Sequence, residues 1–330
     1  MNNFASTLLK WFHDDGRDLP WRQTRDPYAI WLSEIILQQT QVKQGWAYWE
    51  RFMKRWPKVE MLAATTEDEV LREWQGLGYY SRARNLHYAA KQIVDFGRFP
   101  DTLEGIKRLK GVGDYTAAAI GSFAFDLPAA VVDGNVYRVL SRHFGISTPI
   151  NSSEGKKEFA LLAQELLPIS QASNYNQAIM DFGATQCTPS TPNCSNCPLQ
   201  DSCVAFREGR VDVLPVKLKT LKVKERALTY VYVRFQGETA IHRRGEGDIW
   251  QGLYEPLLTE QVPQGAVLLR QGVKHVLTHR ILLADFWLWE PAVRPVLPEG
   301  YFWIKEGELD NYGKPRLIEN LIALVFDYGN

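Results

Sequence analysis

Two isolated carboxylates are the side chains of this sequence best placed to do acid–base chemistry. Glu34 is the one carboxylate in the segment AIWLSEIILQQTQVK, and Asp133 follows the apolar Val131 and Val132. Burial raises the pKa of a glutamate, so Glu34 is a candidate general acid, although a solvated residue on a polar helix face shows the same pattern. Asp133 is a candidate catalytic carboxylate, although a helix N-cap or a solvated turn is the more frequent role.

The cysteines predict a metal centre. Their spacing is C-x6-C-x2-C-x5-C, and the sequence contains no others: Cys187, Cys194, Cys197 and Cys203. Disulfides are rare in a reducing compartment, so thiols this dense indicate a metal. Zinc bound by four cysteines usually shows two CxxC pairs, and this sequence has one. The uneven spacing therefore favours a [4Fe-4S] cluster, with zinc as the alternative.

Three short segments suit contact with nucleic acid. Gly111-Val112-Gly113 precedes an alanine-rich segment, and a glycine turn before a helix N-terminus suits an anion such as a phosphate. Residues 76–82 form a glycine-flanked tip, on which we expect Leu77 and Tyr79 to be exposed as wedges for a base stack. Core packing is the alternative for Tyr79 and Tyr80, the two tyrosines that follow Gly78. The uncharged polar side chains of residues 38–41 suit hydrogen bonds to base edges.

Hydrophobic periodicity predicts the elements that position these residues. Helical spacing occurs in residues 1–22, 28–43, 46–74, where we expect two helices, 82–96 and 156–167. Alternation begins at Ala227, with strands expected at 230–233, 240–242 and 281–289 and a closing helix at 315–325.

A basic, proline-containing segment separates the two patterns and reads as a linker. The expected domains are a helical catalytic region at 1–206, the linker at 207–226 and an α+β domain at 227–330, with a hairpin near 109–116 and the metal module near 187–203.

Composition and charge restrict the class of protein. The 330 residues are 45% hydrophobic and 23% charged, which is ordinary for a globular protein of two domains. Because the formal net charge is zero, binding to DNA would depend on local patches and backbone dipoles. No apolar run has the length of a membrane span, and charges begin too early for a signal peptide. We therefore expect an intracellular, cytoplasmic protein.

Together these segments resemble the adenine DNA glycosylases, the MutY family of the helix-hairpin-helix superfamily, over essentially the whole chain. The resemblance rests on LPWR at 19–22, WLSEIILQQTQV at 31–42, GLGYYSRARNL at 76–86, the hairpin at 109–116, VVDGNVYRVL at 131–140, NQAIMDFGATQC at 176–187 and the cysteine spacing. It implies an all-helical catalytic region in two lobes with DNA between them, a [4Fe-4S] cluster module and a Nudix-like domain that recognises 8-oxoguanine. The implied partner is double-stranded DNA with adenine opposite 8-oxoguanine or guanine, bound by a monomer.

The resemblance also implies a role for each matched residue. Glu34 would protonate the flipped adenine at N7, and Asp133 would stabilise or bond to the oxocarbenium-like sugar. Tyr115 and Asn135 would orient the two carboxyls. The implied adenine-binding residues are Arg22, Leu37, Val42 and Gln177. The implied DNA and lesion contacts are Gln39, Thr40, Leu77, Tyr79, Gly111, Val112, Gly113, Thr278 and His279, and the implied cluster ligands are the four cysteines.

Tyr115 predicts the mode of reaction. In the bifunctional relatives, a lysine just after the hairpin forms a Schiff base with the sugar, and this chain has Tyr115 there. We therefore expect a monofunctional glycosylase, with an endonuclease III-like glycosylase/lyase acting on oxidised pyrimidines as the alternative. A non-catalytic damage-binding or electron-transfer module is a further alternative, against which Glu34 and Asp133 argue.

The second domain departs from its relatives at two points. Leu277-Thr278-His279 stands where the family usually has Phe-Ser-His, so the hydroxyl is retained and the aromatic ring is lost. The glutamate-rich REx2E string of a pyrophosphate-cleaving Nudix enzyme is missing after residue 256. We therefore expect this domain to bind nucleotides and not to hydrolyse them.

Overall fold

The computed structural model describes residues 3–219 and 223–328 and forms two compact units. Unit 1 comprises Met1–Ala63 with Tyr88–Lys219, and unit 2 comprises Ala64–His87 with Thr220–Asn330. The sequence pattern places residues 64–87 in the helical region, whereas their contacts join them to the C-terminal residues. Residues 220–222 of the predicted linker lie outside the described residues.

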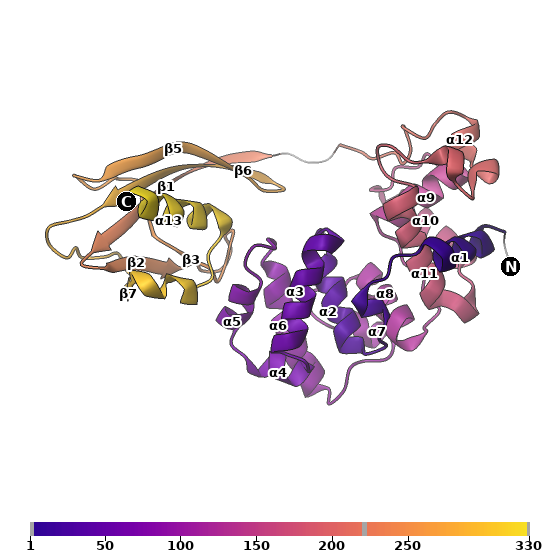
Figure 1. Ribbon diagram of the computed structural model, residues 1–330, viewed down its shortest axis with the longest axis horizontal. Coiled ribbons are helices and arrows are strands. Elements are labelled where there is room, and N and C mark those ends of the chain that lie inside the picture. The colour runs from indigo at the N-terminus through magenta and orange to yellow at the C-terminus, as the bar shows by residue number, and fades with distance from the viewer. Residues whose placement is uncertain (1–2, 220–222, 329–330) are drawn as a thin grey trace. The chain divides into compact units, whose positions relative to one another are not determined.

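The helices occupy most of the chain up to residue 207 (Figure 1). They are α1 (Asn3–Asp15), η1 (Pro20–Arg22), α2 (Pro27–Leu37), α3 (Val42–Arg55), α4 (Val59–Ala64), α5 (Glu67–Glu73), α6 (Ser81–Asp95), α7 (Leu103–Lys107), α8 (Asp114–Phe125), α9 (Gly134–Phe144), α10 (Ser153–Leu166), η2 (Ile169–Gln171), α11 (Ala172–Asp181), the π-helical turn η3 (Phe182–Gln186), η4 (Cys194–Asn196), η5 (Gln200–Ser202) and α12 (Val204–Arg207).

The single helix predicted over residues 28–43 is wrong, because the chain turns between α2 and α3. Gln39 has φ = 56°, a left-handed conformation that cannot continue a right-handed helix, and the Thr40 N–H donates to the Leu37 carbonyl at 3.1 Å. Leu37 and Val42 therefore belong to different helices. The two helices predicted over 46–74 are likewise three, α3 to α5, with Pro57 lying between the first two.

The core of unit 1 unites the beginning of the chain with its later helices. One buried cluster contains residues from five helices: Leu8 of α1, Ala119 of α8, Val139 of α9, Phe159 of α10 and Ile179 of α11. α1 packs against α11, so the N-terminal helix lies beside a segment more than 150 residues later (Figure 1). This packing places η1, which follows α1, next to the end of α11.

A mixed sheet forms most of unit 2. Its strands are β1 (Lys224–Phe235), β2 (Glu238–Arg243), β3 (Tyr254–Glu255), β4 (Leu257–Leu258), β5 (Val267–Val276), β6 (Arg280–Trp289) and β7 (Tyr301–Lys305), followed by η6 (Glu306–Asn311) and α13 (Arg316–Tyr328). In the described residues the order is β3-β2-β1-β6-β5, with β4 on β1 and β7 on β2. The β1–β6 pair is parallel and the other pairs are antiparallel. The predicted strands lie within β1, β2 and β6, and the closing helix is α13.

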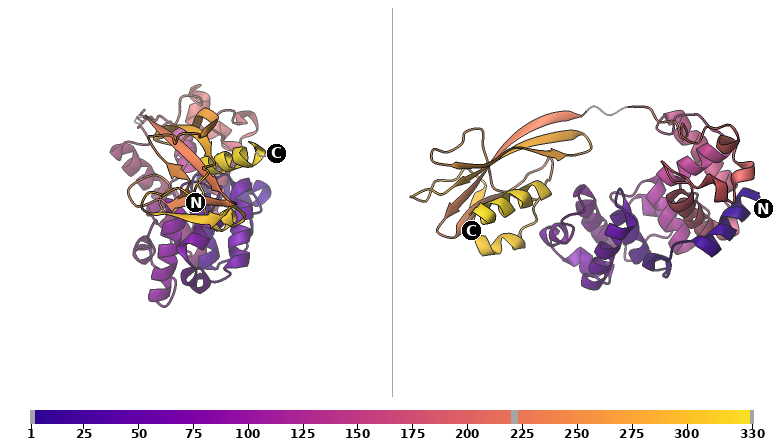
Figure 2. Two further views of the ribbon diagram at one scale, coloured as in Figure 1. Left: turned by 90° about the vertical axis from the view of Figure 1, so that its left-hand side faces the viewer. Right: turned by 45° about the horizontal axis from the view of Figure 1, so that its top comes forward.

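The strand β1 is buried on both faces, and its alternation explains the packing. Tyr230 and Tyr232 join a cluster with Leu317 and Leu321 of α13, whereas Val231 and Val233 join the cluster on the opposite face. Figure 2 shows α13 along one face of the long strands. This arrangement agrees with the α+β domain predicted from Ala227 onward.

Polar contacts join residues 64–87 to the sheet of unit 2. Arg243 of β2 donates to Asp68 at 2.8 Å and to Glu67 at 3.2 Å, and the Tyr254 hydroxyl donates to Asp68 at 3.0 Å. α5 therefore belongs with the sheet. Among the described residues, no helix is long and apolar enough to cross a membrane.

Candidate active site

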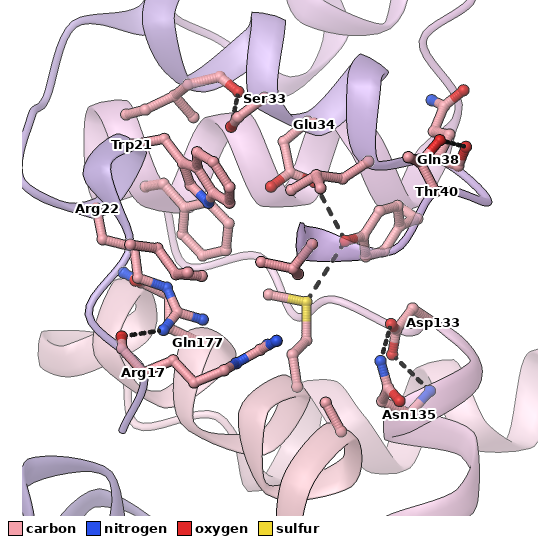
Figure 3. Close-up of a pocket in the computed structure, with 18 of the residues that line it drawn as sticks. Arg17, Trp21, Arg22, Ser33, Glu34, Gln38, Thr40, Asp133, Asn135 and Gln177 are labelled. Carbon is pink, nitrogen blue, oxygen red and sulfur yellow. Dashed lines mark hydrogen bonds between the residues drawn. The ribbon is translucent and has the colours of Figure 1, made fainter. Parts of the chain in front are cut away.

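A cavity of about 1070 Å³ opens among the helices of unit 1 (Figure 3). It brings together the predicted catalytic and adenine-binding residues, together with two of the predicted DNA contacts: Arg22, Glu34, Leu37, Gln39, Thr40, Val42, Tyr115, Asp133, Asn135 and Gln177. These side chains come from η1, α2, α3, α8, α9 and α11 and the turn after α2. The other predicted DNA contacts, Leu77, Tyr79, residues 111–113, Thr278 and His279, do not line this cavity.

Glu34 is held in an apolar helix and faces the cavity. Its side chain is only 7% exposed, because α2 is buried over nearly its whole length. Burial raises the pKa of Glu34 to about 7; the Tyr115 hydrogen bond and the Arg22 charge oppose this rise, and the Asp133 charge adds to it. The solvated-face alternative is therefore wrong, and Glu34 can hold a proton near neutral pH.

Tyr115 connects the first turn of α8 to Glu34. Its hydroxyl donates to Glu34 Oε2 at 3.1 Å and lies 3.4 Å from Met180 Sδ. Burial, together with the neighbouring Glu34 and Asp133, raises the pKa of Tyr115 well above its ordinary value. The phenol therefore stays protonated and serves as a hydrogen-bond donor to the carboxyl.

Asp133 is both a helix N-cap and a cavity residue. Its Oδ1 accepts from the N–H groups of Asn135 at 2.9 Å and Val136 at 2.8 Å, and its Oδ2 accepts from Asn135 Nδ2 at 2.8 Å. Burial raises the pKa of Asp133, and these hydrogen bonds oppose that rise. The cap thus fixes the carboxylate at the cavity wall and supplies donors that stabilise its ionised form.

Residues behind the wall fix the segment that carries Asp133. The buried Asn176 accepts from the Val131 N–H at 3.2 Å and donates to the Ala129 carbonyl at 2.8 Å. A Cβ on Gly183 of η3 would lie 2.6 Å from the Asn135 Cβ and 3.0 Å from its backbone, so only glycine fits there. The backbone of η3 therefore packs directly against Asn135 of α9 and leaves no room for a side chain at position 183.

Two polar side chains of the predicted adenine pocket have defined partners. Arg22 donates to Asp181 through Nη1 at 2.8 Å and Nη2 at 2.7 Å. Gln177 Nε2 donates to Ser173 Oγ at 3.2 Å, which leaves its carbonyl oxygen for another partner. Arg22 is thus a partly buried side chain whose charge is paired with that of Asp181.

Two carboxyls in one cavity but in different surroundings can divide an acid–base task. Glu34 sits among apolar side chains and favours its protonated form, whereas Asp133 accepts three hydrogen bonds that favour its anion. A neutral acid beside a leaving group and an anion beside a developing positive charge are the requirements of glycosidic bond hydrolysis.

The predicted phosphate turn lies between α7 and α8. Gly111 has φ = 81°, which requires glycine, and Gln92 of α6 holds the turn by accepting from the Lys110 N–H at 2.8 Å. The Val112 N–H donates to the Leu109 carbonyl at 3.1 Å, so this amide does not point to an anion as a free donor. Gly113 is the N-cap of α8 without a side-chain cap, which leaves the first amides of that helix open to an anion.

The glycine-flanked tip of unit 2 presents one of its two expected wedges. Tyr79 is 47% exposed and has φ = 47°, whereas Leu77 is 8% exposed and packs inward, so the expectation that Leu77 is exposed is wrong. The Tyr79 hydroxyl lies 2.7 Å from Thr278 Oγ1. His279 is exposed, and its carbonyl accepts from the Lys224 N–H at 3.1 Å.

The four cysteines surround one small cavity of unit 1. Short turns bring them there: the Cys197 N–H donates to the Cys194 carbonyl at 3.2 Å, and the Cys187 N–H closes the π-helical turn at 2.7 Å. Among the described residues, no group of three or more His, Cys, Asp or Glu converges as a single metal ion would require. In a [4Fe-4S] cube each of four cysteine ligands binds its own iron, and four thiols that line one cavity supply that set of ligands. The four thiols therefore fit an iron–sulfur cluster.

Several residues of the site have no role assigned from the sequence. Asn176, Met180, Asp181 and Gly183 all lie in the segment NQAIMDFGATQC, of which only Gln177 and Cys187 are assigned a role from sequence. Asp181 is the one carboxylate in that segment, and Gly183 the one glycine. These are the signals that could have identified them.

Two family models match the chain. The HhH-GPD superfamily base excision DNA repair protein matches residues 32–168, and the NUDIX domain matches residues 229–324. The chain is 35% identical over 254 residues to the adenine DNA glycosylase of Buchnera aphidicola subsp. Schizaphis graminum, which covers 76% of this chain and 73% of that protein. This chain belongs to the adenine DNA glycosylase family. The resemblance read from the motifs is thereby confirmed, as are a helical glycosylase domain and a Nudix-like domain.

The family extends to eukaryotes and has neighbours among solved structures. The adenine DNA glycosylase of Mus musculus is 44% identical over 226 residues, which span 64% of this chain and 44% of the mouse protein. A thermostable thymine-DNA glycosylase is 34% identical with a TM-score of 0.58, over 62% of this chain and 95% of that one. An endonuclease III in a DNA complex shares the fold at 23% identity and a TM-score of 0.54, over 62% of this chain and 94% of that one.

Proposed function

We propose that this member of the family is a monofunctional base excision repair enzyme that hydrolyses the N-glycosidic bond of adenine paired with 8-oxoguanine or guanine. The observation that carries the proposal is the shared cavity in which Glu34, with a pKa of about 7, and Asp133 both reach the same space. Such a cavity has the size to receive a base that leaves the duplex.

In the proposed reaction, the adenine leaves the stack and enters the cavity. Protonated Glu34 donates its proton to N7 of the base, which turns adenine into a better leaving group. Asp133 stabilises the positive charge that develops on the sugar, and Tyr115 holds Glu34 in place through the 3.1 Å hydrogen bond. Water then completes the hydrolysis. Arg22, Leu37, Val42 and Gln177 form the adenine pocket.

The absence of a suitable amine favours base release without strand cleavage. Among the described residues that line the cavity, Lys43 alone carries an amine, and it is exposed at the start of α3. A Schiff base needs an amine with a lowered pKa, which burial provides. The position just after the hairpin is occupied by Tyr115. The proposed product is therefore an intact strand with an abasic site.

The cysteines and the lesion contacts complete the proposal. Cys187, Cys194, Cys197 and Cys203 hold a [4Fe-4S] cluster that orders residues 187–203. Gln39, Thr40, Tyr79, Thr278 and His279 contact the DNA around the lesion, and Gly111, Gly113 and the start of α8 bind a backbone phosphate. The Nudix-like domain binds 8-oxoguanine without hydrolysing nucleotides.

The test is single-turnover base release from duplexes that contain adenine opposite 8-oxoguanine, guanine or thymine, each with and without hot alkali. The proposal expects cleavage only after alkali, with the fastest release opposite 8-oxoguanine. Strand cleavage without alkali, or activity confined to an oxidised pyrimidine, would assign the chain to the glycosylase/lyase alternative. Glu34→Gln should retain DNA binding and lose base release.

A further inference from the structure

Asp181, the last residue of α11, is a carboxylate behind the wall of the cavity. Its side chain is 0% exposed, and it does not line the cavity. A buried carboxylate is costly unless its oxygens are fully hydrogen-bonded. Its partners therefore explain why the chain keeps it there.

Two arginines of the segment between α1 and α2 satisfy both oxygens of Asp181. Arg22 binds in the two-pronged arrangement at 2.8 and 2.7 Å, and Arg17 donates its backbone N–H at 2.9 Å and Nε at 2.9 Å. Arg17 Nη2 makes a further contact with Oδ1. Burial favours the neutral acid, but the hydrogen bonds from Arg22 and Arg17 outweigh it and hold the pKa of Asp181 below its ordinary value.

The arrangement fixes the orientation of Arg22. Nη1 also donates to the Arg17 carbonyl at 2.8 Å, so three hydrogen bonds hold the guanidinium, two to Asp181 and one to that carbonyl. Arg22 and Arg17 both line the cavity, with Asp181 behind them; Figure 3 shows the two arginines on the side of the cavity away from Asp133. A guanidinium held in one plane offers its remaining donors in a fixed direction.

We propose that Asp181 is a positioning residue for adenine release: it fixes the guanidinium plane of Arg22 in the cavity wall and offsets the Arg22 charge beside Glu34. This inference rests on the proposed function. Asp181 does not line the cavity, so its effect on adenine release is transmitted through Arg22, and the Arg17→Met variant separates this effect from that of Arg17. Replacing Asp181 should therefore change a property of the reaction that the loss of a purely structural ion pair would not change.

The property that should change is the pH at which Glu34 loses its proton. The groups that face Glu34 are Tyr115 of α8, Asp133 at the start of α9 and Arg22 of η1, and among these Arg22 lowers the pKa of Glu34. The positive charge of Arg22 acts more strongly when Asp181 is neutral. Base release needs protonated Glu34, so its rate falls as pH rises through that pKa, and the fall must begin at lower pH when Asp181 is uncharged.

The experiment compares Asp181→Asn with Arg17→Met by single-turnover adenine release at saturating protein between about pH 6 and 9. Asp181→Asn keeps the size of the side chain and removes its charge. Arg17→Met keeps the carbonyl that accepts from Arg22, leaves Asp181 charged and removes a positive charge, so it cannot lower the pKa of Glu34. For Asp181→Asn we expect the alkaline fall about 0.5 to 1 pH unit lower, with roughly three- to tenfold slower release near pH 8 than in the parent. For Arg17→Met the fall stays in place or moves upward.

An unshifted fall in Asp181→Asn, or an equal downward shift in Arg17→Met, overturns the inference. Asp181→Glu retains the charge at a displaced position and covers the case in which Asp181→Asn does not fold. Asp181→Glu should lower the maximal rate of adenine release and leave the alkaline fall at the same pH as in the parent. A shift in the pH of that fall would contradict the inference. A parent protein that releases no adenine would instead refute the proposed function, and the two failures are thereby distinguished.

Discussion

The hydroxyl of Tyr79, on the glycine-flanked tip, lies 2.7 Å from the hydroxyl of Thr278, at the turn before β6. The two residues are 199 positions apart and lie in the same compact unit. Tyr79 has a left-handed backbone conformation that is unfavourable for a tyrosine. The hydrogen bond to Thr278 helps to hold its side chain in this orientation. The two predicted lesion contacts are therefore joined by a hydrogen bond.

This pairing predicts that Tyr79→Phe and Thr278→Val have non-additive effects. Each variant removes one hydroxyl and keeps most of the shape of the side chain. We expect each to lower the preference for 8-oxoguanine over guanine roughly three- to tenfold, and the double variant to lose little more than either single one. Affinity for the two mispaired duplexes measures this preference. Additive losses would show that the hydroxyls contact the DNA independently.

Replacement of Glu34 by glutamine should abolish base release. A general acid contributes typically about 10²- to 10⁴-fold to a rate, and glutamine has no proton to donate. In the parent, single-turnover release should be greatest below about pH 7 and decline above it, because the pKa of Glu34 is about 7. The variant should lose this dependence along with the activity. A variant with parental rates would remove Glu34 as the acid.

The same replacement should stabilise the folded protein at high pH. Burial raises the pKa of Glu34 from 4.5 to about 7, so the folded state holds its proton more tightly than the unfolded state does. The stability that this binding contributes is present below about pH 4.5 and is lost as pH rises toward 7. Glu34→Gln should therefore match the parent at acid pH and exceed its free energy of unfolding by about 2 to 3 kcal/mol near pH 8. Denaturant titrations at the two pH values test this; equal stability at both would contradict the raised pKa.

Gly183→Ala should disturb the site because the added Cβ would press against Asn135. The added Cβ would lie 2.6 Å from the Asn135 Cβ and 3.0 Å from its backbone, and backbone cannot turn aside as a flexible side chain does. We expect a loss of about 1 to 3 kcal/mol in the free energy of unfolding and slower base release. Gly134→Ala is the matched control for the free energy of unfolding alone, since its Cβ would meet nothing within 4 Å but Gly134 lines the cavity. Similar losses in both variants would argue against the close approach.

Cysteine replacement tests the cluster. Cys197→Ser removes one of the four thiols around the cavity, and we expect lower iron and sulfide content and a lower melting temperature. Ser195→Ala changes an exposed neighbour in η4 and should keep parental metal content. Zinc in place of iron and sulfide in the parent would favour the alternative left open by the spacing.

Periodicity and motif spacing predict much of this fold and site. The alternation in Tyr230-Val231-Tyr232-Val233 identifies β1, and the isolated Glu34 and Asp133 identify the two carboxyls of the cavity. These signals are local: they depend on neighbouring residue types and on whether a segment is buried. A helix break at Gln39 is harder to predict, because glutamine is a good helix former and the left-handed turn is imposed by the surrounding structure.

Other features depend on partners that are distant in sequence. Asp181 reads as an ordinary polar residue until the fold places Arg17 and Arg22 against it, more than 150 positions away. Gly183 is required only because Asn135 packs on it. The grouping of residues 64–87 with the sheet depends on charged contacts such as Arg243 to Asp68, which leave no periodic pattern.

The helix α8 has a consequence for how this protein can evolve. Its uncapped first turn, from Gly113, and the phenol of Tyr115 lie within one turn of the same rigid cylinder, about 5.4 Å of rise. If the start of α8 binds a DNA phosphate as proposed, a mutation that moves α8 to strengthen that contact also displaces the hydrogen bond from Tyr115 to Glu34. DNA affinity and the alignment of Glu34 are therefore coupled at this helix. Selection can change one of them without the other only through residues elsewhere in the chain.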